Sequence, residues 1–169
     1  EAAYSSDGLT WTRVNNALPV GDFYNWVGGL TFGTGKFLAI ANTGDVVYSF
    51  DGQTWYNDTM PTQDGSTQMN WKSCKYEQGM FFATCDTGNQ VIGADPTTGE
   101  TTFTCTSEDG IHWTGRNLSA QKSWVTSAHG NPNGVPIHLL LAGGAGSDAV
   151  AILDTGCTAK GRADLSSAG

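Results

Sequence analysis

The sequence predicts an all-β chain in which four-stranded antiparallel sheets follow one another as repeated units. The first observation is the composition, because Gly is 23 of 169 residues, aromatic residues make up 11% and charged residues only 14%. Such a composition suits strands joined by tight turns better than helices. The second observation is an eight-residue phrase that returns along the chain, with its aspartates at Asp7, Asp51 and Asp109.

The spacing of this phrase predicts a stacked or radial array. Successive aspartates are 44 and 58 residues apart, and a further 45 residues lead to Asp154, where a damaged copy keeps the aspartate and loses the tryptophan. Propeller blades repeat at about 40–45 residues and contain four strands each. We therefore expect a β-propeller-like array, incomplete as a ring because propellers usually need at least four blades to close.

Each repeat is expected to contain the same strands in the same order. A tryptophan opens the first strand at Trp26, Trp71 and Trp124, and apolar runs at 36–41, 80–85 and 137–142 form the second. The third strand, such as 45–49, leads into the phrase, and the fourth starts at its tryptophan. Apolar runs of this kind predict strands buried on both faces. The longer second interval indicates an insertion at 94–100, expected to be a longer hairpin between the second and third strands.

The repeats are expected to occupy residues 1–157, as a partial blade followed by about three blades, of which the last degenerates at its end. Residues 158–169 are small and polar, and we interpret them as a linker or the start of a further domain. The missing blades would lie outside these residues or come from neighbouring subunits.

The repeated phrase is expected to have a structural role. An Asp side chain can accept hydrogen bonds from backbone N–H groups two or three residues ahead, a following Gly supplies positive φ, and a Ser adds a second side-chain bond. The tryptophan is expected to pack between blades. A shared catalytic centre is disfavoured, because equivalent positions of a propeller lie on different blades. The residues with these roles are Ser5, Asp7, Gly8, Trp11, Ser49, Asp51, Gly52, Trp55, Ser107, Asp109, Gly110 and Trp113.

The second copy, from Ser49 to Trp55, resembles the Asp-box (BNR repeat) of sialidase-like propellers and of many bacterial and phage surface proteins. That motif typically runs Ser-x-Asp-x-Gly-x-Thr-Trp, and all three copies here are one residue shorter between Asp and Trp. The resemblance covers roughly residues 1–157. It implies a propeller fold with Asp-box turns remote from any active face.

A second resemblance lies near the C-terminal end, where residues 159–164 are similar to short links that precede glycine-rich β-modules in virion proteins of tailed phages, especially those that infect cyanobacteria. The composition of the chain, low in charge and rich in Gly, Thr, Asn and Trp, also resembles that of phage tail or appendage proteins. The resemblance implies a virion or extracellular location.

Charge and motif content exclude several classes of function. The formal net charge is −8 and the eight Lys and Arg are scattered, which disfavours nucleic acid as a partner. The sequence contains no run of about 20 apolar residues, so membrane insertion is not predicted. The three histidines show no metal-ligand spacing, no nucleotide loop is present, and we expect no metal or cofactor. Cys74, Cys85, Cys105 and Cys157 lack a Cys-x-x-Cys pair and are expected to be free, buried thiols, with Cys74 opposite about Phe82 in a hairpin.

Catalysis has little support in the sequence. A sialidase resembling the family would need three convergent arginines, whereas Arg13 and Arg116 both follow a motif tryptophan and so lie on separate outer strands. Binding is better supported, because loops at 15–25, 57–70 and 117–123 would form one rim of a propeller. Carboxylates beside aromatic rings suit sugar hydroxyls and ring faces. The candidate glycan-binding residues of this rim are Asp22, Tyr24, Asp58 and Asp64.

The sequence therefore favours a non-enzymatic structural and adhesion module of a larger assembly, above all a bacteriophage tail, neck or fibre component. Its expected partners are other virion subunits or copies of itself. The alternative is a lectin-like module that binds surface glycans for host or cell attachment. A glycosidase fragment is the least favoured interpretation, because two facing carboxylates cannot be recognised in the sequence.

Overall fold

A computed structural model describes residues 2–14, 18, 26, 29–62, 69–86, 101–134, 137–143, 149–153 and 159–164. These residues form fourteen strands and one short 3-10 helix, and the strands make a two-stranded hairpin and three four-stranded antiparallel sheets that do not close into a ring. The predicted all-β, propeller-like class is confirmed. No helix in the described ranges has the length and apolar character that a membrane crossing requires.

The strands of each sheet are consecutive in the sequence. The N-terminal hairpin consists of β1 (Ala2–Tyr4) and β2 (Thr12–Val14). The first sheet consists of β3 (Leu30–Gly33), β4 (Lys36–Ile40), β5 (Asp45–Ser49) and β6 (Tyr56–Thr59). The second sheet consists of β7 (Asn70–Glu77), β8 (Met80–Asp86), β9 (Thr101–Ser107) and β10 (Thr114–Lys122). The third sheet consists of β11 (Trp124–Gly130), β12 (Ile137–Ala142), β13 (Ala149–Leu153) and β14 (Ala159–Asp164), with the 3-10 helix η2 (Pro132–Gly134) between its first two strands.

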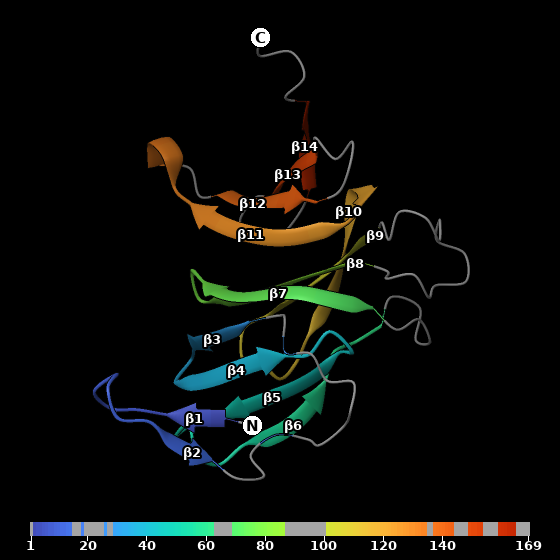
Figure 1. Cartoon of the computed structure of the whole chain (residues 1–169). Coiled ribbons are helices and arrows are strands. Elements are labelled where there is room, and N and C mark those ends of the chain that lie inside the picture. The colour runs from blue at the N-terminus through green and yellow to red at the C-terminus, as the bar shows by residue number, and fades with distance from the viewer. Residues whose placement is uncertain are drawn as a thin grey trace.

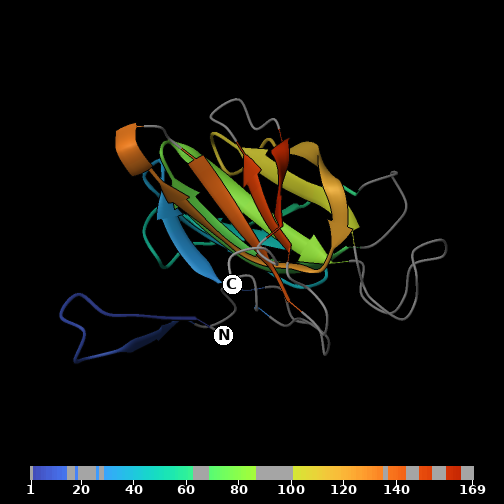
Figure 2. The same cartoon turned by 90° about the horizontal axis from the view of Figure 1, so that it is seen from above.

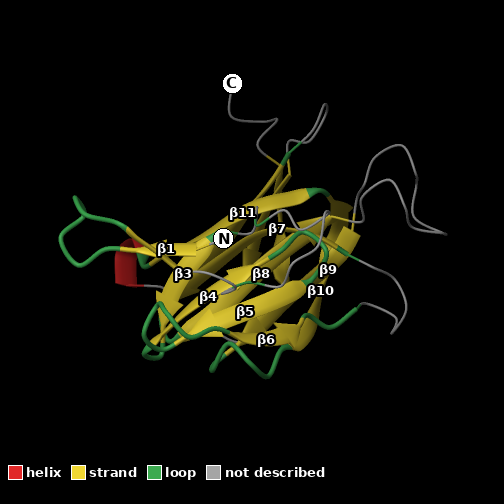
Figure 3. Ribbon diagram, turned by 60° about the horizontal axis from the view of Figure 1, so that its bottom comes forward, coloured by secondary structure: helices red, strands yellow, loops and turns green. Residues whose placement is uncertain are grey.

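The three sheets are stacked in chain order. In Figure 1 they rise from the N-terminal hairpin to the C-terminal end, and β7 contacts β3 on one side and β11 on the other. Seen from above, the N-terminal hairpin projects away from the stack (Figure 2). Strands make up most of the stack, and loops and turns join them at their ends (Figure 3).

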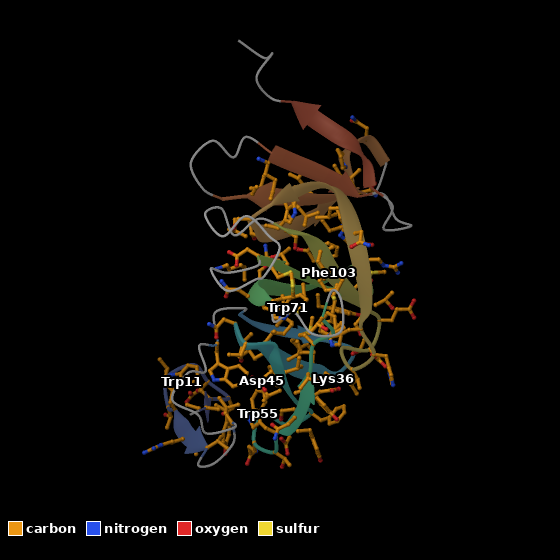
Figure 4. The ribbon with its side chains drawn as sticks, turned by 90° about the vertical axis from the view of Figure 1, so that its right-hand side faces the viewer. Trp11, Lys36, Asp45, Trp55, Trp71 and Phe103 are labelled. Carbon is orange, nitrogen blue, oxygen red and sulfur yellow. The ribbon has the colours of Figure 1, made fainter. Side chains whose placement is uncertain are left out.

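Two apolar clusters hold the stack together. The first joins Leu38 and Ile40 of the first sheet to Trp71 and Phe81 of the second. Trp71 and Phe103 lie together in the middle of the molecule (Figure 4), with ring centroids 6.4 Å apart. The second cluster joins the second sheet to the third and contains Phe82, Leu118, Trp124 and Leu140.

Strand β8 is buried on both faces, as the apolar run predicted. Phe81 and Phe82 are consecutive residues, so their side chains point to opposite faces of the sheet. Phe81 belongs to the first cluster and Phe82 to the second, and each is at most 1% exposed. The second sheet is therefore covered by a neighbour on each side.

Most of the predicted strand boundaries are confirmed. The third strand at 45–49 matches β5, and the fourth strands β2, β6 and β10 each begin one residue after the phrase tryptophan. Residues 158–169, expected to be a linker or the start of a further domain, contain β14, which pairs with β13 as the fourth strand of the third sheet. Trp26 precedes the first strand of its sheet, which starts only at Leu30. The insertion at 94–100 lies outside the described residues.

The hairpin of β7 and β8 corrects the predicted register. Cys74 lies opposite Ala83, not Phe82, because the turn has two central residues, Gln78 and Gly79, both with positive φ. Cys74, Cys85 and Cys105 are free and buried, as expected, and Cys157 lies outside the described residues. Burial raises the pKa of the Cys105 thiol to about 12.

Replacing Gly33 with alanine tests the packing of the first sheet on the second. A Cβ at Gly33 would lie 2.2–2.6 Å from ring atoms of Tyr76, so the Gly33→Ala variant must displace this ring. We expect a loss of about 1–3 kcal/mol in the free energy of unfolding, measured with urea. Gly130→Ala is the matched control, because its nearest neighbour would be 3.8 Å away and its φ is not positive. Equal stability of the two variants would contradict close contact between the sheets.

Candidate functional site

The three intact copies of the phrase fold into the same turn, which we call the Asp-Gly turn. In the second copy, Oδ1 of Asp51 accepts hydrogen bonds from the backbone N–H of Gln53 (2.8 Å) and Thr54 (2.7 Å), and Oγ of Ser49 accepts one from Gly52 N (2.8 Å). The corresponding bonds are formed by Asp7 with Ser5 and by Asp109 with Ser107. Gly8, Gly52 and Gly110 have φ of 74°, 75° and 75°. The turns thus have the predicted geometry.

These hydrogen bonds keep the turn carboxylates ionised. Backbone donation from Thr54 and Gln53 lowers the pKa of Asp51 to about 2, and donation from Thr10 and Leu9 does the same for Asp7. Burial by itself would raise the pKa of Asp109, but hydrogen bonds from the side chain and backbone of His112 lower it overall. The exposed His112 ring has its pKa raised by the same Asp109 contact. The turn carboxylates are therefore hydrogen-bond acceptors within their own turns.

The third Asp-Gly turn also joins two sheets. Nζ of Lys36, a residue only 5% exposed in the first sheet, donates a hydrogen bond to the backbone carbonyl of Asp109 in the second. A Cβ at Gly110 would lie 2.7 Å from Cδ1 of Leu38 and 3.0 Å from Cε2 of Phe81. A side chain at this position would therefore have to displace Leu38 of the first sheet and Phe81 of the second. Sequence patterns gave no sign of the role of Lys36, because its partner is 73 residues away.

The turn tryptophans differ in their surroundings, and the expectation that each packs between blades is wrong for Trp11. Trp11 is 64% exposed, because the N-terminal hairpin lies beside the stack with only its own two strands. Trp55 is half-buried and donates from Nε1 to the Gly52 carbonyl (3.3 Å). Trp113 alone of the three packs against the first cluster, which contains side chains of both the first and second sheets. Figure 4 shows Trp11 and Trp55 at the end of the molecule remote from the third sheet.

The predicted glycan-binding rim is described at only one of its four residues. Asp22, Tyr24 and Asp64 lie outside the described residues. Asp58 lies within β6, not in a loop, and its Oδ1 accepts a hydrogen bond from the backbone N–H of Thr59 (2.8 Å). By strand alternation it shares a face with Tyr56, which is 47% exposed and stacks on Tyr48 with ring centroids 5.3 Å apart. This part of β6 brings an aromatic ring and a carboxylate to one surface.

A different apolar surface is exposed on the first sheet. Thr31 faces the second sheet, since its Oγ1 accepts a hydrogen bond from the backbone N–H of Tyr76, so its neighbours Leu30 and Phe32 face away from it. Leu30 is 64% and Phe32 57% exposed. Phe32 packs against Phe37 across the strands, with ring centroids 4.9 Å apart. We call Leu30, Phe32 and Phe37 the open face.

A polar hollow of about 280 Å³ lies on the second sheet. Its lining comes from strands β8, β9 and β10 and from the third Asp-Gly turn, and consists of Met80, Thr106, Ser107, Glu108, Asp109, His112, Thr114 and Arg116. Nε of Arg116 donates a hydrogen bond to Oγ1 of Thr106 (3.2 Å). From its position in the chain, Arg116 was predicted only to be the repeat equivalent of Arg13, because its hydrogen-bond partner Thr106 lies on the neighbouring strand β9. In the part of the chain with described positions, no group of three or more His, Cys, Asp or Glu side chains is arranged to hold a metal ion.

The stacked four-stranded sheets define a β-propeller-like fold, and comparison with solved structures agrees. The chain is similar to the structure titled "YCF48 bound to D1 peptide", with a TM-score of 0.52 and 15% sequence identity over 93% of this chain. It spans 44% of the length of that structure's chain. At this identity the likeness shows the fold alone. Comparisons with protein-family models and with curated proteins give no match.

The lowered pKa of Asp51 gives a pH dependence with a definite sign. Because its pKa is about 2 when folded and about 3.9 in a free chain, its stabilising effect is present above pH 4 and is lost as the pH falls toward 2. We expect a carboxyl NMR titration midpoint near 2. The difference in thermal stability between the wild type and Asp51→Asn should shrink between pH 4 and pH 2. A midpoint near 4 would show that the turn does not hold the ionised carboxylate.

Two glycine variants separate backbone strain from contact between sheets. Gly110 and Gly8 have nearly equal φ, 75° and 74°, but only Gly110 lies against Leu38 and Phe81. Gly8→Ala is expected to cost about 1–2 kcal/mol for the left-handed conformation. Gly110→Ala should cost about 1–3 kcal/mol more, because its methyl group has no room. Denaturant unfolding measures both, and equal losses would contradict docking of the third turn on the first sheet.

Proposed function

We propose that the chain is a non-enzymatic structural and adhesion module, joined to other subunits of a larger assembly through the open face. The observation that carries this proposal is the difference between two equivalent surfaces of the repeat. Tyr76 and Phe81 pair across β7 and β8 just as Phe32 and Phe37 pair across β3 and β4. Phe81 is fully buried and Tyr76 half-buried against the first sheet. Their equivalents are more exposed, because Phe37 is only half-buried and Phe32 is 57% exposed.

The N-terminal hairpin indicates which strands would cover the open face. Its two strands flank an Asp-Gly turn, so they correspond to the third and fourth strands of a sheet, as β5 and β6 do. Cβ of Tyr4 in this hairpin and Cε2 of Phe37 both lie within 4 Å of a Cβ built at Gly52, at the outer end of the first sheet. Strands equivalent to the first and second of a sheet would cover Leu30 and Phe32. We propose that polypeptide outside these residues supplies them, above all neighbouring subunits, which are either other proteins or copies of this chain.

The setting that we propose is a virion, in a bacteriophage tail, neck or fibre. Support for this setting comes from the Asp-box-like phrase and from the Gly-, Thr- and Trp-rich texture of the chain. The three Asp-Gly turns also support a non-enzymatic role. Each turn aspartate accepts hydrogen bonds from backbone N–H groups of its own turn and has a lowered pKa, so none is suited to donate a proton near neutral pH.

A lectin-like module remains the second candidate function, and one observation favours it. Tyr56 and Asp58 present an exposed aromatic ring and a carboxylate on the same face of β6. Sugars are commonly bound by such a pair, because the ring contacts the apolar face of a pyranose and the carboxylate accepts hydrogen bonds from its hydroxyls. Attachment to surface glycans is compatible with a role in a virion.

The native mass of the assembly tests the proposed function. We expect the chain, whose own mass is 17.8 kDa, to occur in a much larger particle when it is isolated from its source under native conditions. Substituting Leu30→Ser together with Phe32→Ser should release it from that particle, because the covering strands lose their apolar contact. Leu9→Ser is the control, since Leu9 is 86% exposed in a turn outside the open face. A free monomer of the polypeptide that contains this chain, or unchanged incorporation of the double variant, would overturn the proposal.

A further inference from the structure

The hollow on the second sheet lies on the side that faces the third sheet. Thr106 is opposite both Phe82 and Thr114 in the strand pairing, so these three residues share a face. Phe82 packs in the second cluster with Trp124 and Leu140 of the third sheet. The strand residues Thr106 and Thr114 therefore place the hollow on the side of the second sheet that faces the third, away from the open face.

Arg116 supplies the hollow with a positively charged group that donates hydrogen bonds. Its guanidinium carries five N–H donors, and Nε is engaged by Oγ1 of Thr106, a residue only 3% exposed. This bond to a buried hydroxyl positions the planar group, which is itself half-buried. Among the side chains that the structure describes, which do not include those of β13 and β14, no carboxylate lies within 4.0 Å of the Arg116 nitrogens. A positioned guanidinium of this kind is suited to a bidentate carboxylate partner.

The acidic residues at the rim do not occupy that role. Asp109 is held by its own turn, where Oδ1 accepts from Ile111 N and His112 N, and Oδ2 lies 2.6 Å from Nδ1 of His112. Glu108 is exposed at the rim. The remaining lining offers hydroxyls from Thr106 and Thr114 and an apolar side chain from Met80.

We propose that this hollow binds the carboxylate of a hexuronate unit in an acidic polysaccharide. The Arg116 guanidinium would grip the sugar carboxylate. Thr114, Glu108 and His112 offer hydrogen-bonding groups for the ring hydroxyls, and Met80 offers a contact for the apolar face of the ring. A volume of about 280 Å³ suits a single sugar unit, with the rest of the polymer outside.

This inference deepens the adhesion role proposed above by naming a ligand class, and it uses a surface separate from Leu30 and Phe32. Failure of either proposal can therefore be recognised by itself. Loss of assembly in the open-face variant with intact sugar binding would concern only the first, and the reverse result only the second.

The test is a titration of the full chain with three probes. Binding is monitored by two-dimensional NMR of the backbone N–H and arginine Nε–H signals. The probes are a trigalacturonate, the neutral trigalactoside that lacks the carboxylates, and an N-acetylated tripeptide with a free C-terminal carboxylate. We expect the trigalacturonate alone to shift the signals of Thr106, Thr114 and the Arg116 Nε–H. Shifts located elsewhere, or equal shifts with the neutral sugar, would overturn the proposal. Binding of the peptide but not of the acidic sugar would also overturn it.

A matched pair of arginine variants gives the second measurement. Arg116→Gln removes the charge and the planar fork, and we expect at least about a tenfold loss of affinity for the trigalacturonate. Arg13→Gln removes the same charge from another strand that follows a turn tryptophan, and its affinity should stay unchanged. Equal affinity of Arg116→Gln and the wild type would overturn the proposal. Should Arg116→Gln not fold, the positions of the shifts in the wild type decide the outcome.

Discussion

Burial on both faces is the constraint on which the rest of this structure depends. Residues 81–86 of β8 are all buried, with Phe81 packed toward the first sheet and Phe82 toward the third. A sheet with two apolar faces cannot be stable alone, because one face would remain in water. Stacking is therefore a condition of folding for each unit, and the molecule is held together by contacts between neighbours in the sequence.

Polar groups give the stack its alignment once apolar burial has brought the sheets together. Nζ of Lys36 reaches a backbone carbonyl of the second sheet, and Nζ of Lys75 reaches the carbonyl of Ser127 in the third. Backbone N–H groups of Trp71 and Tyr76 donate to acceptors of the first sheet, the Asn42 carbonyl and Thr31 Oγ1. Directional bonds of this kind penalise sliding of one sheet over the next, since a buried donor without its acceptor is costly.

Local features of the sequence predicted the fold well, and tertiary features were missed. The apolar run at 36–41 and the strand at 45–49 match β4 and β5, because burial on both faces and turn residues leave a pattern within a few residues. Strand β14 was missed because its residues, from Ala159 to Asp164, show no apolar alternation, and its pairing with β13 is a property of the backbone. The register of Cys74 depended on whether the turn has two or three central residues.

In the candidate site, too, local features could be predicted from the sequence and tertiary features could not. The Asp-Gly turns could be predicted because a hydrogen bond to a residue two or three positions ahead is encoded locally. Three other features depend on which strands become neighbours: the contact of Asp109 with Lys36, the open face, and the surroundings of Arg116. The identity of a single residue does not indicate which strands will lie next to it. Three of the four predicted rim residues lie outside the described ranges, and Asp58 lies in a strand.

The N-terminal hairpin also has a mechanical consequence. Its strands are three residues each, and in the described chain they pair only with each other, from Ala2 opposite Val14 to Tyr4 opposite Thr12. Tension applied at the N-terminal end would load this ladder in the peeling direction, so that its bonds break one after another. The four-stranded sheets share load across several ladders. A force that reaches the first sheet through the hairpin would therefore extend the hairpin before it separates the strands of that sheet.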